Sequence, residues 1–488
     1  MPPIENPLRP VIAGPEGFES TVQKSAIALP QLRAKLFSHP ISSSLLCVLL
    51  WVALLGIFRV TTRNEYEKRP IGDAAYFCEM TQSFYLGEPP AINFPTMHSR
   101  RILGPWLAAR LCSLLDLIDG KKATTAFHYG YYAEDYFHNW SPEAAFTYDR
   151  IMTSWKVLNS AALLGIFLSL FGILRHFQPN SAPPWQPSWL AFILCCSPTL
   201  GRLYFIWPLM NDLVGISLGL LSLFCLLKNR VLLSGLLFGA AMLARENLAL
   251  IYPCFVWALF TLAKGCQGRK LLKLSSIHAL LSFSPYCWIC ALPVFPDVAP
   301  FSDWSSGIQQ AAAGATQDYW SLVVYHLRRS FLADQALLRN CLVYWSVLGP
   351  LLFLALRFYP WKKTELQMDA FLWVAFLLII AASFHVDRYV VYAVFPLTLL
   401  ARHALNRGIR WWVAGLLSCF YLAAVQFFNE RVNAKTLQIE FAEKAVLISA
   451  CFWGACALVI VLLDPFFRSW LSSIPQKTAV REEGALSF

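Results

Sequence analysis

Residues 209–247 read LMNDLVGISLGLLSLFCLLKNRVLLSGLLFGAAMLAREN, and this stretch decides the fold class. It holds two apolar runs, 209–227 and 231–247, on either side of a short basic turn that contains Lys228 and Arg230. An apolar run of about twenty residues is long enough, as an α-helix, to cross the roughly 30 Å hydrocarbon core of a bilayer. The stretch therefore predicts two membrane-spanning helices joined by a turn.

Similar runs recur along nearly the whole chain. Of its 488 residues, 57% are hydrophobic and 14% are charged, and the mean hydropathy is +0.50. These values exclude an ordinary water-soluble globule, and we predict an all-α polytopic membrane protein with about twelve transmembrane helices. The expected spans are residues 43–60, 152–173, 188–206, 209–227, 231–247, 249–263, 274–295, 338–356, 369–384, 389–405, 411–428 and 445–463.

Lysine and arginine orient these spans, because short cytoplasmic loops are enriched in positive charge. The loops of one parity carry most of the basic residues, so both termini are predicted to be cytoplasmic. The same bias accounts for much of the net charge of +11, and no nucleic-acid partner is expected. The basic residues that set the orientation are Arg33, Lys35, Lys228, Arg230, Lys264, Arg269, Lys270, Lys273, Lys362, Lys363, Arg402, Arg407, Arg410, Arg468 and Lys477.

The chain divides into two tails and a membrane domain. Residues 1–42 are polar, contain proline and lack the apolar core of a signal peptide, so we expect a cytoplasmic tail. The transmembrane domain is expected over 43–463, with a second cytoplasmic tail over 464–488. Its outer loops, 61–151 and 297–337, are longer than ordinary connections. The composition of the second loop fits a mobile cover over a site and an ordinary surface loop equally well. A bacterial inner membrane is favoured over that of the endoplasmic reticulum.

The first outer loop contains two predicted amphipathic helices. One begins at Asp73 and stops near Gly87, with helix capping as the plain role of the aspartate. The other is expected to lie along the membrane surface with its apolar face down. Cys78 and Cys112 fall in the same loop and could pair if that compartment is oxidising. The apolar stripe of the second helix comprises Leu103, Leu107, Leu111, Leu114 and Ile118.

Ionisable residues lie at the ends of several predicted spans. A charge in the hydrocarbon region costs several kcal/mol, so it persists mainly where it has a partner or a task. By the predicted topology these residues share the outer side of the membrane with Asp73, Arg100 and Arg101, which favours one outward-facing site. The alternative is that they form ion pairs that fix helix packing. The residues are Asp212, Arg245, Glu246, Asp387 and Arg388.

Carboxylates and arginines at a membrane surface suit a phosphate-linked lipid. A carboxylate can deprotonate a hydroxyl or bind a divalent metal, and the guanidinium fork matches phosphate oxygens. The sequence contains no GxxxxGK[ST] loop, no His/Cys cluster with zinc spacing and no GxSxG elbow. Nucleotide-driven chemistry is therefore not indicated.

Two motifs after the first span resemble the integral-membrane glycosyltransferases of the C superfamily (GT-C). They are GDAAY at 72–76 and HSRRILGPWLA at 98–108. This superfamily includes polyprenyl-phosphate-dependent mannosyl- and arabinosyltransferases. Later stretches, which cover the chain to about residue 405, are similar to further landmarks of such proteins. They are Asp212 opening a span, residues 235–246, and Asp387-Arg388-Tyr389 with Pro396.

The resemblance implies inverting transfer of a sugar from a polyprenyl-phosphate donor to a hydroxyl of a glycan, lipid or protein acceptor at the outer face. Asp73 matches the catalytic acid of the family and would be the general base. One of Arg100, Arg101, Arg245 and Arg388 would stabilise the departing lipid phosphate. The remaining predicted substrate-binding residues are Asp212, Glu246, His385 and Asp387.

The chain departs from the family at one informative place. Many members pair two acids in the first loop, whereas Ala74 and Ala75 follow Asp73, and the next acid is Glu79. We therefore predict no cofactor, because a firmly bound divalent metal lacks its paired-acid motif. The competing function is a transporter or lipid flippase, which would place charges near mid-span and show repeat symmetry. A non-catalytic scaffold protein of the same fold is a third possibility.

Overall fold

A computed structural model defines the fold over most of the chain. The described residues are 49–53, 56, 73–90, 94–95, 100–127, 140–179, 185–196, 200, 211–263, 268–292, 294, 297–298, 323–324, 327–328, 331, 336–382, 390–410, 412–419 and 439–473.

The described chain is almost entirely helical, as predicted. The α-helices are α3 (Asp73–Leu86), α5 (Leu103–Asp119), α6 (Pro142–Phe177), α7 (Trp185–Cys195), α9 (Asp212–Leu227), α10 (Val231–Ala244), α11 (Tyr252–Leu262), α12 (Gly268–Ala291), α15 (Ala336–Phe358), α16 (Lys363–Met368), α17 (Ala370–Ala382), α19 (Val394–Leu400), α20 (Arg402–Arg407) and α22 (Ile439–Ser473). Two 3₁₀ helices, η3 (Glu246–Ile251) and η4 (Val390–Ala393), precede α11 and α19.

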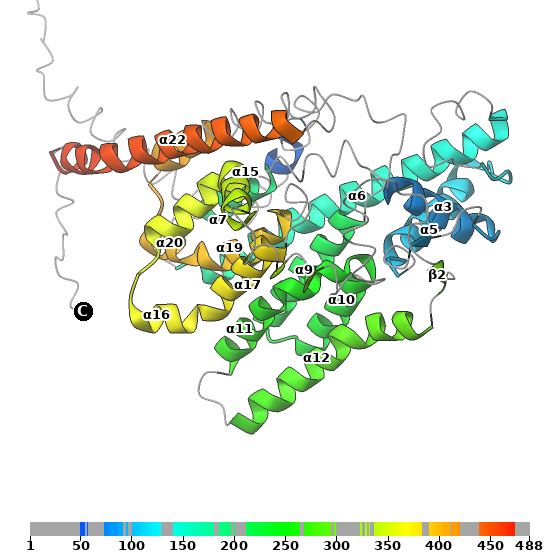
Figure 1. Cartoon of the computed structure of the whole chain (residues 1–488), viewed down its shortest axis with the longest axis horizontal. Coiled ribbons are helices and arrows are strands. Elements are labelled where there is room, and N and C mark those ends of the chain that lie inside the picture. Colours follow the sequence, from blue (N-terminus) through cyan, green and yellow to red (C-terminus); the bar gives the residue numbers. More distant parts are fainter. Residues whose placement is uncertain are drawn as a thin grey trace, which may run out of the picture.

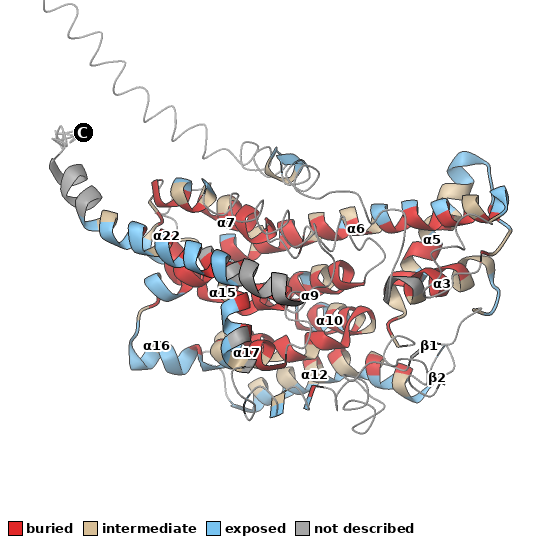
Figure 2. Ribbon diagram, turned by 45° about the horizontal axis from the view of Figure 1, so that its top comes forward, coloured by how far each residue is buried: buried red, intermediate tan, exposed pale blue. Residues whose placement is uncertain are grey.

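The helices form a bundle with distinct ends. α3 and α5 lie at one end, beside the first turns of α6, whereas α16 and α20 lie toward the other (Figure 1). Buried residues fill the interior of the bundle around α9 and α10 (Figure 2). α10 packs against both α9 and α12, and α9 also packs against α6.

Glycines allow α10 and α12 to approach closely. A Cβ atom on Gly239 would lie 2.6 Å from the Leu281 carbonyl oxygen and 2.9 Å from Cγ of Pro285. A Cβ on Gly235 would lie 2.8 Å from Cβ of Leu281. A spacing of four between glycines is typical of such close helix contacts.

A buried polar chain links four helices of the bundle. Ser222 of α9 donates to the Ser234 carbonyl oxygen of α10 at 2.7 Å, and the Ser234 hydroxyl lies 3.0 Å from Nε2 of His278 in α12. Nδ1 of His278 is 3.1 Å from the Tyr252 hydroxyl of α11. Because each polar atom has a partner, the histidine can be buried among apolar helices.

Two helices of the described chain are long and apolar enough to cross a membrane, namely Pro142–Phe177 and Leu271–Ala291. The others that match predicted spans are shorter. α9, for example, has 16 residues and is about 24 Å long, less than the hydrocarbon thickness. The prediction of an all-helical chain is therefore confirmed, whereas twelve complete spans are not established.

Both helices predicted in the first outer loop are present in the structure. α3 begins at Asp73, and the chain leaves it at Gly87, whose φ of +77° suits glycine. α5 is also present, but its buried face consists of small residues: Gly104, Pro105, Ala108, Ala109 and Cys112. The predicted apolar stripe is divided, since Leu114 and Ile118 are exposed, whereas Leu103 and Leu107 are partly buried against the core.

A short parallel strand pair joins the two outer loops. β1 (Phe94–Pro95) of the first loop pairs with β2 (Asp297–Val298) of the second. Most of the second loop falls outside the described residues. The two loops thus meet at the end of the molecule that holds α3 and α5.

Candidate functional site

Four of the predicted site residues come together as two buried ion pairs. Nε of Arg101 donates to both carboxylate oxygens of Glu246, at 3.0 and 2.9 Å, and its Nη2 also contacts Oε1. Arg245 donates through Nε to Oδ1 of Asp212 at 2.8 Å and through Nη2 to Oδ2 at 2.7 Å. Each of the four side chains is at most 4% exposed.

A break in the helix explains how neighbouring residues serve different pairs. Arg245 ends α10 in an extended conformation, with φ −153° and ψ 107°, and η3 starts at Glu246. Side chains of successive residues in extended chain point in opposite directions. Arg245 therefore reaches Asp212 at the start of α9, whereas Glu246 reaches Arg101, two residues before the start of α5.

Two further residues complete the cluster, and sequence reasoning missed both. The Tyr392 hydroxyl of η4 donates to Oδ1 of Asp212 at 2.9 Å. The side-chain amide of Asn211 donates to the Arg101 carbonyl oxygen at 2.8 Å. Tyr392 lies in an apolar run and looked like a core residue. Asn211, however, is next to Asp212 at a predicted span end, and that position was the available signal.

Arg100 lies on the α12 side of the same cluster. Its side chain is half-buried and within interaction range of the Tyr286 hydroxyl and the Cys290 thiol. Glu246 acts electrostatically on the same two groups. Consecutive arginines thus have different surroundings, since Arg101 is held by a carboxylate and Arg100 faces α12.

The structure places the backbone of Asp73 at the first position of α3, which packs on α5. The position of its side chain lies outside what the structure describes. The predicted substrate-binding residues His385, Asp387 and Arg388 also lie outside the described residues. Their roles therefore stay predictions.

The charges of the two ion pairs sum to zero. Taking a charge out of water costs several kcal/mol, and only a well-placed opposite charge with full hydrogen bonding offsets this cost. Both arginines already make bidentate contacts, which are the contacts a phosphate would require. This arrangement suits fixing the stretch before α5 to the bundle through Arg101, and α10 to α9 through Arg245, better than direct substrate binding by either arginine.

Polar contacts also fasten α3 and α5 to α6, so that α3, α5 and the first turns of α6 form a helical cap. Arg150 contacts Asp119 at 2.6 Å and Asp116 at 3.2 Å. The Tyr85 hydroxyl donates to Asp116. Burial, helped by this hydrogen bond to Asp116, raises the pKa of Tyr85 above its ordinary value. The tyrosine is therefore a neutral donor, which makes the cap a firm structure.

Cys78 and Cys112 both lie inside the cap. The two thiols are free and buried, and they lie close enough together for Cys112 to act electrostatically on Cys78. Burial is the main cause that raises the pKa of Cys112 to about 11. The thiol is thus protonated and unreactive near neutral pH. Pairing of these cysteines stays a prediction.

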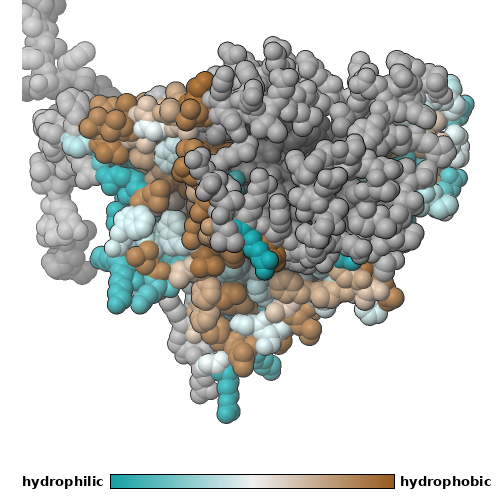
Figure 3. Space-filling model, in the orientation of Figure 1, coloured by the Kyte–Doolittle hydropathy of each residue, from teal (hydrophilic) through white to brown (hydrophobic). Residues whose placement is uncertain are grey.

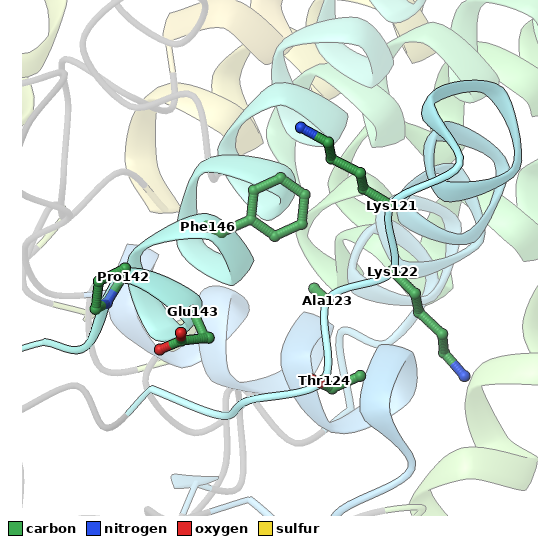
Figure 4. A pocket seen from close by; sticks show the side chains of 7 residues that line it. All are labelled: Lys121, Lys122, Ala123, Thr124, Pro142, Glu143 and Phe146. Carbon is green, nitrogen blue, oxygen red and sulfur yellow. The ribbon is translucent and has the colours of Figure 1, made fainter.

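A surface hollow of about 330 Å³ lies between the end of α5 and the start of α6. Figure 4 shows Lys121 and Lys122 pointing away from each other at its edge, opposite Glu143 and Phe146 of α6. None of the predicted site residues that the structure describes lines this hollow. It therefore adds no group to the site above.

A second buried polar cluster lies at the opposite end of the bundle. Asp369, which follows α16, accepts hydrogen bonds from Arg402, from Nε2 of His403 at 2.9 Å and from Nε1 of Trp257 at 3.1 Å. Arg402 also lies over the Trp257 ring, 4.8 Å from its centroid. The cluster thereby ties α16, α20 and α11 together.

Glu365, Asp369 and His403 offer ligand atoms within 4.8 Å of one another, a geometry that could hold a metal ion. Arg402 already neutralises Asp369, and a cation there would face that guanidinium. The donor set therefore suits an ion pair better than a metal centre.

The comparisons with known proteins give no further guide to these clusters. No protein-family model matches the chain, and no curated protein matches its sequence.

Proposed function

We propose that the chain is a multi-span membrane glycosyltransferase of the GT-C type, which moves a sugar from a polyprenyl-phosphate donor to an acceptor hydroxyl. The main support is that the loop carrying Asp73 is a folded cap, fastened through Arg101 and Glu246 to the bundle. The Asp212–Arg245 pair lies beside that fastening. A base at the start of α3 would thus act from a firm support.

The exposed apolar surface supports the membrane setting. In the apolar window of α12, only 17% of the residues are buried. Water-soluble proteins rarely expose large contiguous apolar patches, whereas a helix surrounded by lipid does so along its length. We propose about twelve spans, with the shorter helices extended by neighbouring segments. The exposed apolar residues of α12 and its end include Leu272, Leu280, Trp288, Leu292 and Val294.

Figure 3 shows how hydrophilic and hydrophobic residues are distributed on one face of the molecule. Hydrophilic residues gather at the edge where α16 lies and at the opposite edge near the start of α6, and the described surface between them, along the lower side of the view, is mostly hydrophobic. A bilayer around this middle region would leave the cap on one side and α16 on the other. The cap side is the outer side in the predicted orientation, with both termini in the cytoplasm.

The proposed chemistry assigns one residue to proton transfer. Asp73 takes the proton of the acceptor hydroxyl as its oxygen bonds to the anomeric carbon. The bond from that carbon to the phosphate oxygen breaks on the opposite side, so the configuration inverts and polyprenyl phosphate leaves. Arg100 and Arg388 are the proposed phosphate contacts, and His385 and Asp387 the proposed sugar contacts. Arg101 fastens the cap to the bundle through Glu246, and Arg245 joins the end of α10 to the start of α9 through Asp212.

The test measures release of polyprenyl phosphate by the purified full chain from labelled polyprenyl-phosphate sugars. We expect Asp73→Asn to lower turnover by about 10²- to 10⁴-fold, because it removes the proton acceptor. Glu88→Gln is a matched control, since Glu88 is an exposed acid just after the same helix. It should retain full turnover.

Two outcomes would contradict the proposal in different ways. Full turnover by Asp73→Asn would remove the general-base role but keep the transferase. No turnover with any donor, together with movement of labelled lipid across a reconstituted bilayer, would establish the transporter instead.

A further inference from the structure

An exposed basic and aromatic segment lies at the end of the bundle opposite the cap. Trp361, Lys362 and Lys363 are all exposed, and we call these three residues the collar. The collar connects α15 to α16, close to the hydrophilic edge visible in Figure 3. In the predicted orientation this is the cytoplasmic side.

The collar is held in place although it is exposed. The Trp361 side chain is 60% exposed, yet its Nε1 donates to the Leu356 carbonyl oxygen at 3.2 Å. Its ring meets the Tyr359 ring edge-on at 4.9 Å and stacks on the Trp373 ring at 6.2 Å, with 23° between the planes. An indole fixed in this way presents one face to the surroundings without losing freedom on binding.

The buried cluster around Asp369 holds the segment that carries the two lysines. Asp369 follows α16 and is bound by Arg402 and His403 of α20. The His403 ring also packs edge-on against Tyr359, 5.1 Å away. The segment that carries Lys362 and Lys363 is thus attached at both ends to the bundle, which fixes where their charges lie.

An apolar face continues from the collar along α17. Phe371, Val374 and Leu377 are 38%, 46% and 54% exposed, and their spacing of three puts them on one side of the helix. Phe260 of α11 is also exposed and stacks on Phe371, with ring centroids 5.5 Å apart. The surface therefore passes from ammonium groups through an indole to aliphatic side chains. The same order runs from lipid headgroup to acyl chain across a membrane interface.

We propose that the collar binds the headgroup of an anionic phospholipid, whose acyl chains lie on the apolar face formed by Phe260, Phe371, Val374 and Leu377. The charge of Lys362 and Lys363 complements a headgroup with net negative charge, which a zwitterionic lipid lacks. This inference rests on the membrane setting of the proposed function and is independent of glycosyl transfer.

The experiment compares lipid retention in nanodiscs that contain equal amounts of phosphatidylglycerol and phosphatidylcholine. Full-length protein is extracted, and the lipids that remain bound are counted by native mass spectrometry. We expect the preference for phosphatidylglycerol over phosphatidylcholine to be about 25-fold higher in the wild type than in the double variant Lys362→Gln with Lys363→Gln. The reason is the attraction of each lysine to an anionic surface. The preference should weaken as salt rises.

The matched control is Lys121→Gln with Lys122→Gln. It removes two adjacent exposed lysines at the cap end and should keep the preference. Equal retention of the two lipids by the wild type, or equal loss of the preference in both double variants, would contradict lipid binding by the collar. Either result would leave the membrane setting unaffected. A protein that does not enter the bilayer would overturn the membrane setting and the collar together.

Discussion

At the scale of single residues, the neighbours Arg245 and Glu246 show how the chain manages buried charge. Each finds an opposite charge on another element, Asp212 for the arginine and Arg101 for the glutamate. Removing one member of such a pair leaves an uncompensated charge in the interior, whereas removing both does not. The function of each residue can therefore be separated from its structural role by paired substitutions.

We expect Arg245→Met to destabilise the protein by about 3–5 kcal/mol, because Asp212 would stay buried without its partner. Adding Asp212→Asn should restore most of the loss and still leave an acceptor for Tyr392. The measurement is the midpoint of thermal unfolding in detergent, with the fraction of folded protein determined by size-exclusion chromatography.

Sugar-transfer activity distinguishes the two roles of this pair. The double variant should regain activity along with stability if the pair only joins α9 to α10. A stable but inactive double variant would show that Asp212 or Arg245 contacts substrate directly.

At the scale of elements, small residues decide which helices meet. α10 contacts α12 through Gly235 and Gly239, and the fully buried face of α5 consists of small residues. Close approach of apolar helices gives many dispersion contacts, which must drive packing where lipid removes the hydrophobic effect between helices. The amphipathic pattern of α5 predicted a helix correctly, but it did not show which face the neighbouring helices would cover.

We expect Gly239→Ala to destabilise the protein by about 1–3 kcal/mol, because the new methyl group would meet the Leu281 carbonyl and Pro285. A backbone oxygen cannot move aside without shifting α12. Gly454→Ala in α22 is the control, since a Cβ there meets nothing within 4 Å. Unfolding midpoints of the two variants give the comparison, and equal midpoints would contradict close packing at Gly239.

At the scale of the whole molecule, polar clusters hold both ends and exposed apolar helices lie between them. The Arg101–Glu246 pair fastens the cap at one end, and Asp369 fastens α16 and α20 at the other. Buried charges at both ends, with a neutral polar chain between them, fit the proposed membrane setting, because charge is costly in the hydrocarbon region.

Exposed cysteines in the apolar region give a direct measure of the surrounding solvent. Cys287 of α12 and Cys451 of α22 are exposed on the protein surface. In liposomes we expect a charged, membrane-impermeant maleimide to leave both unlabelled, because lipid would cover them. Lys363→Cys should label once the reagent reaches its side of the membrane. Rapid labelling of Cys287 and Cys451 in intact liposomes would contradict the membrane setting.

The sequence by itself determined the helical class, the positions of most helices and the gathering of charges at helix ends, because these follow from apolar run length and local residue preferences. It also indicated two alternative roles for Asp212, Arg245 and Glu246, namely a shared functional site and ion pairs that fix helix packing. Only the tertiary structure paired Arg245 with Asp212 and Glu246 with Arg101, covered the small-residue face of α5 and set Trp361 against Trp373. Such contacts join residues far apart in the chain, so their geometry depends on how whole helices pack and no local pattern contains it.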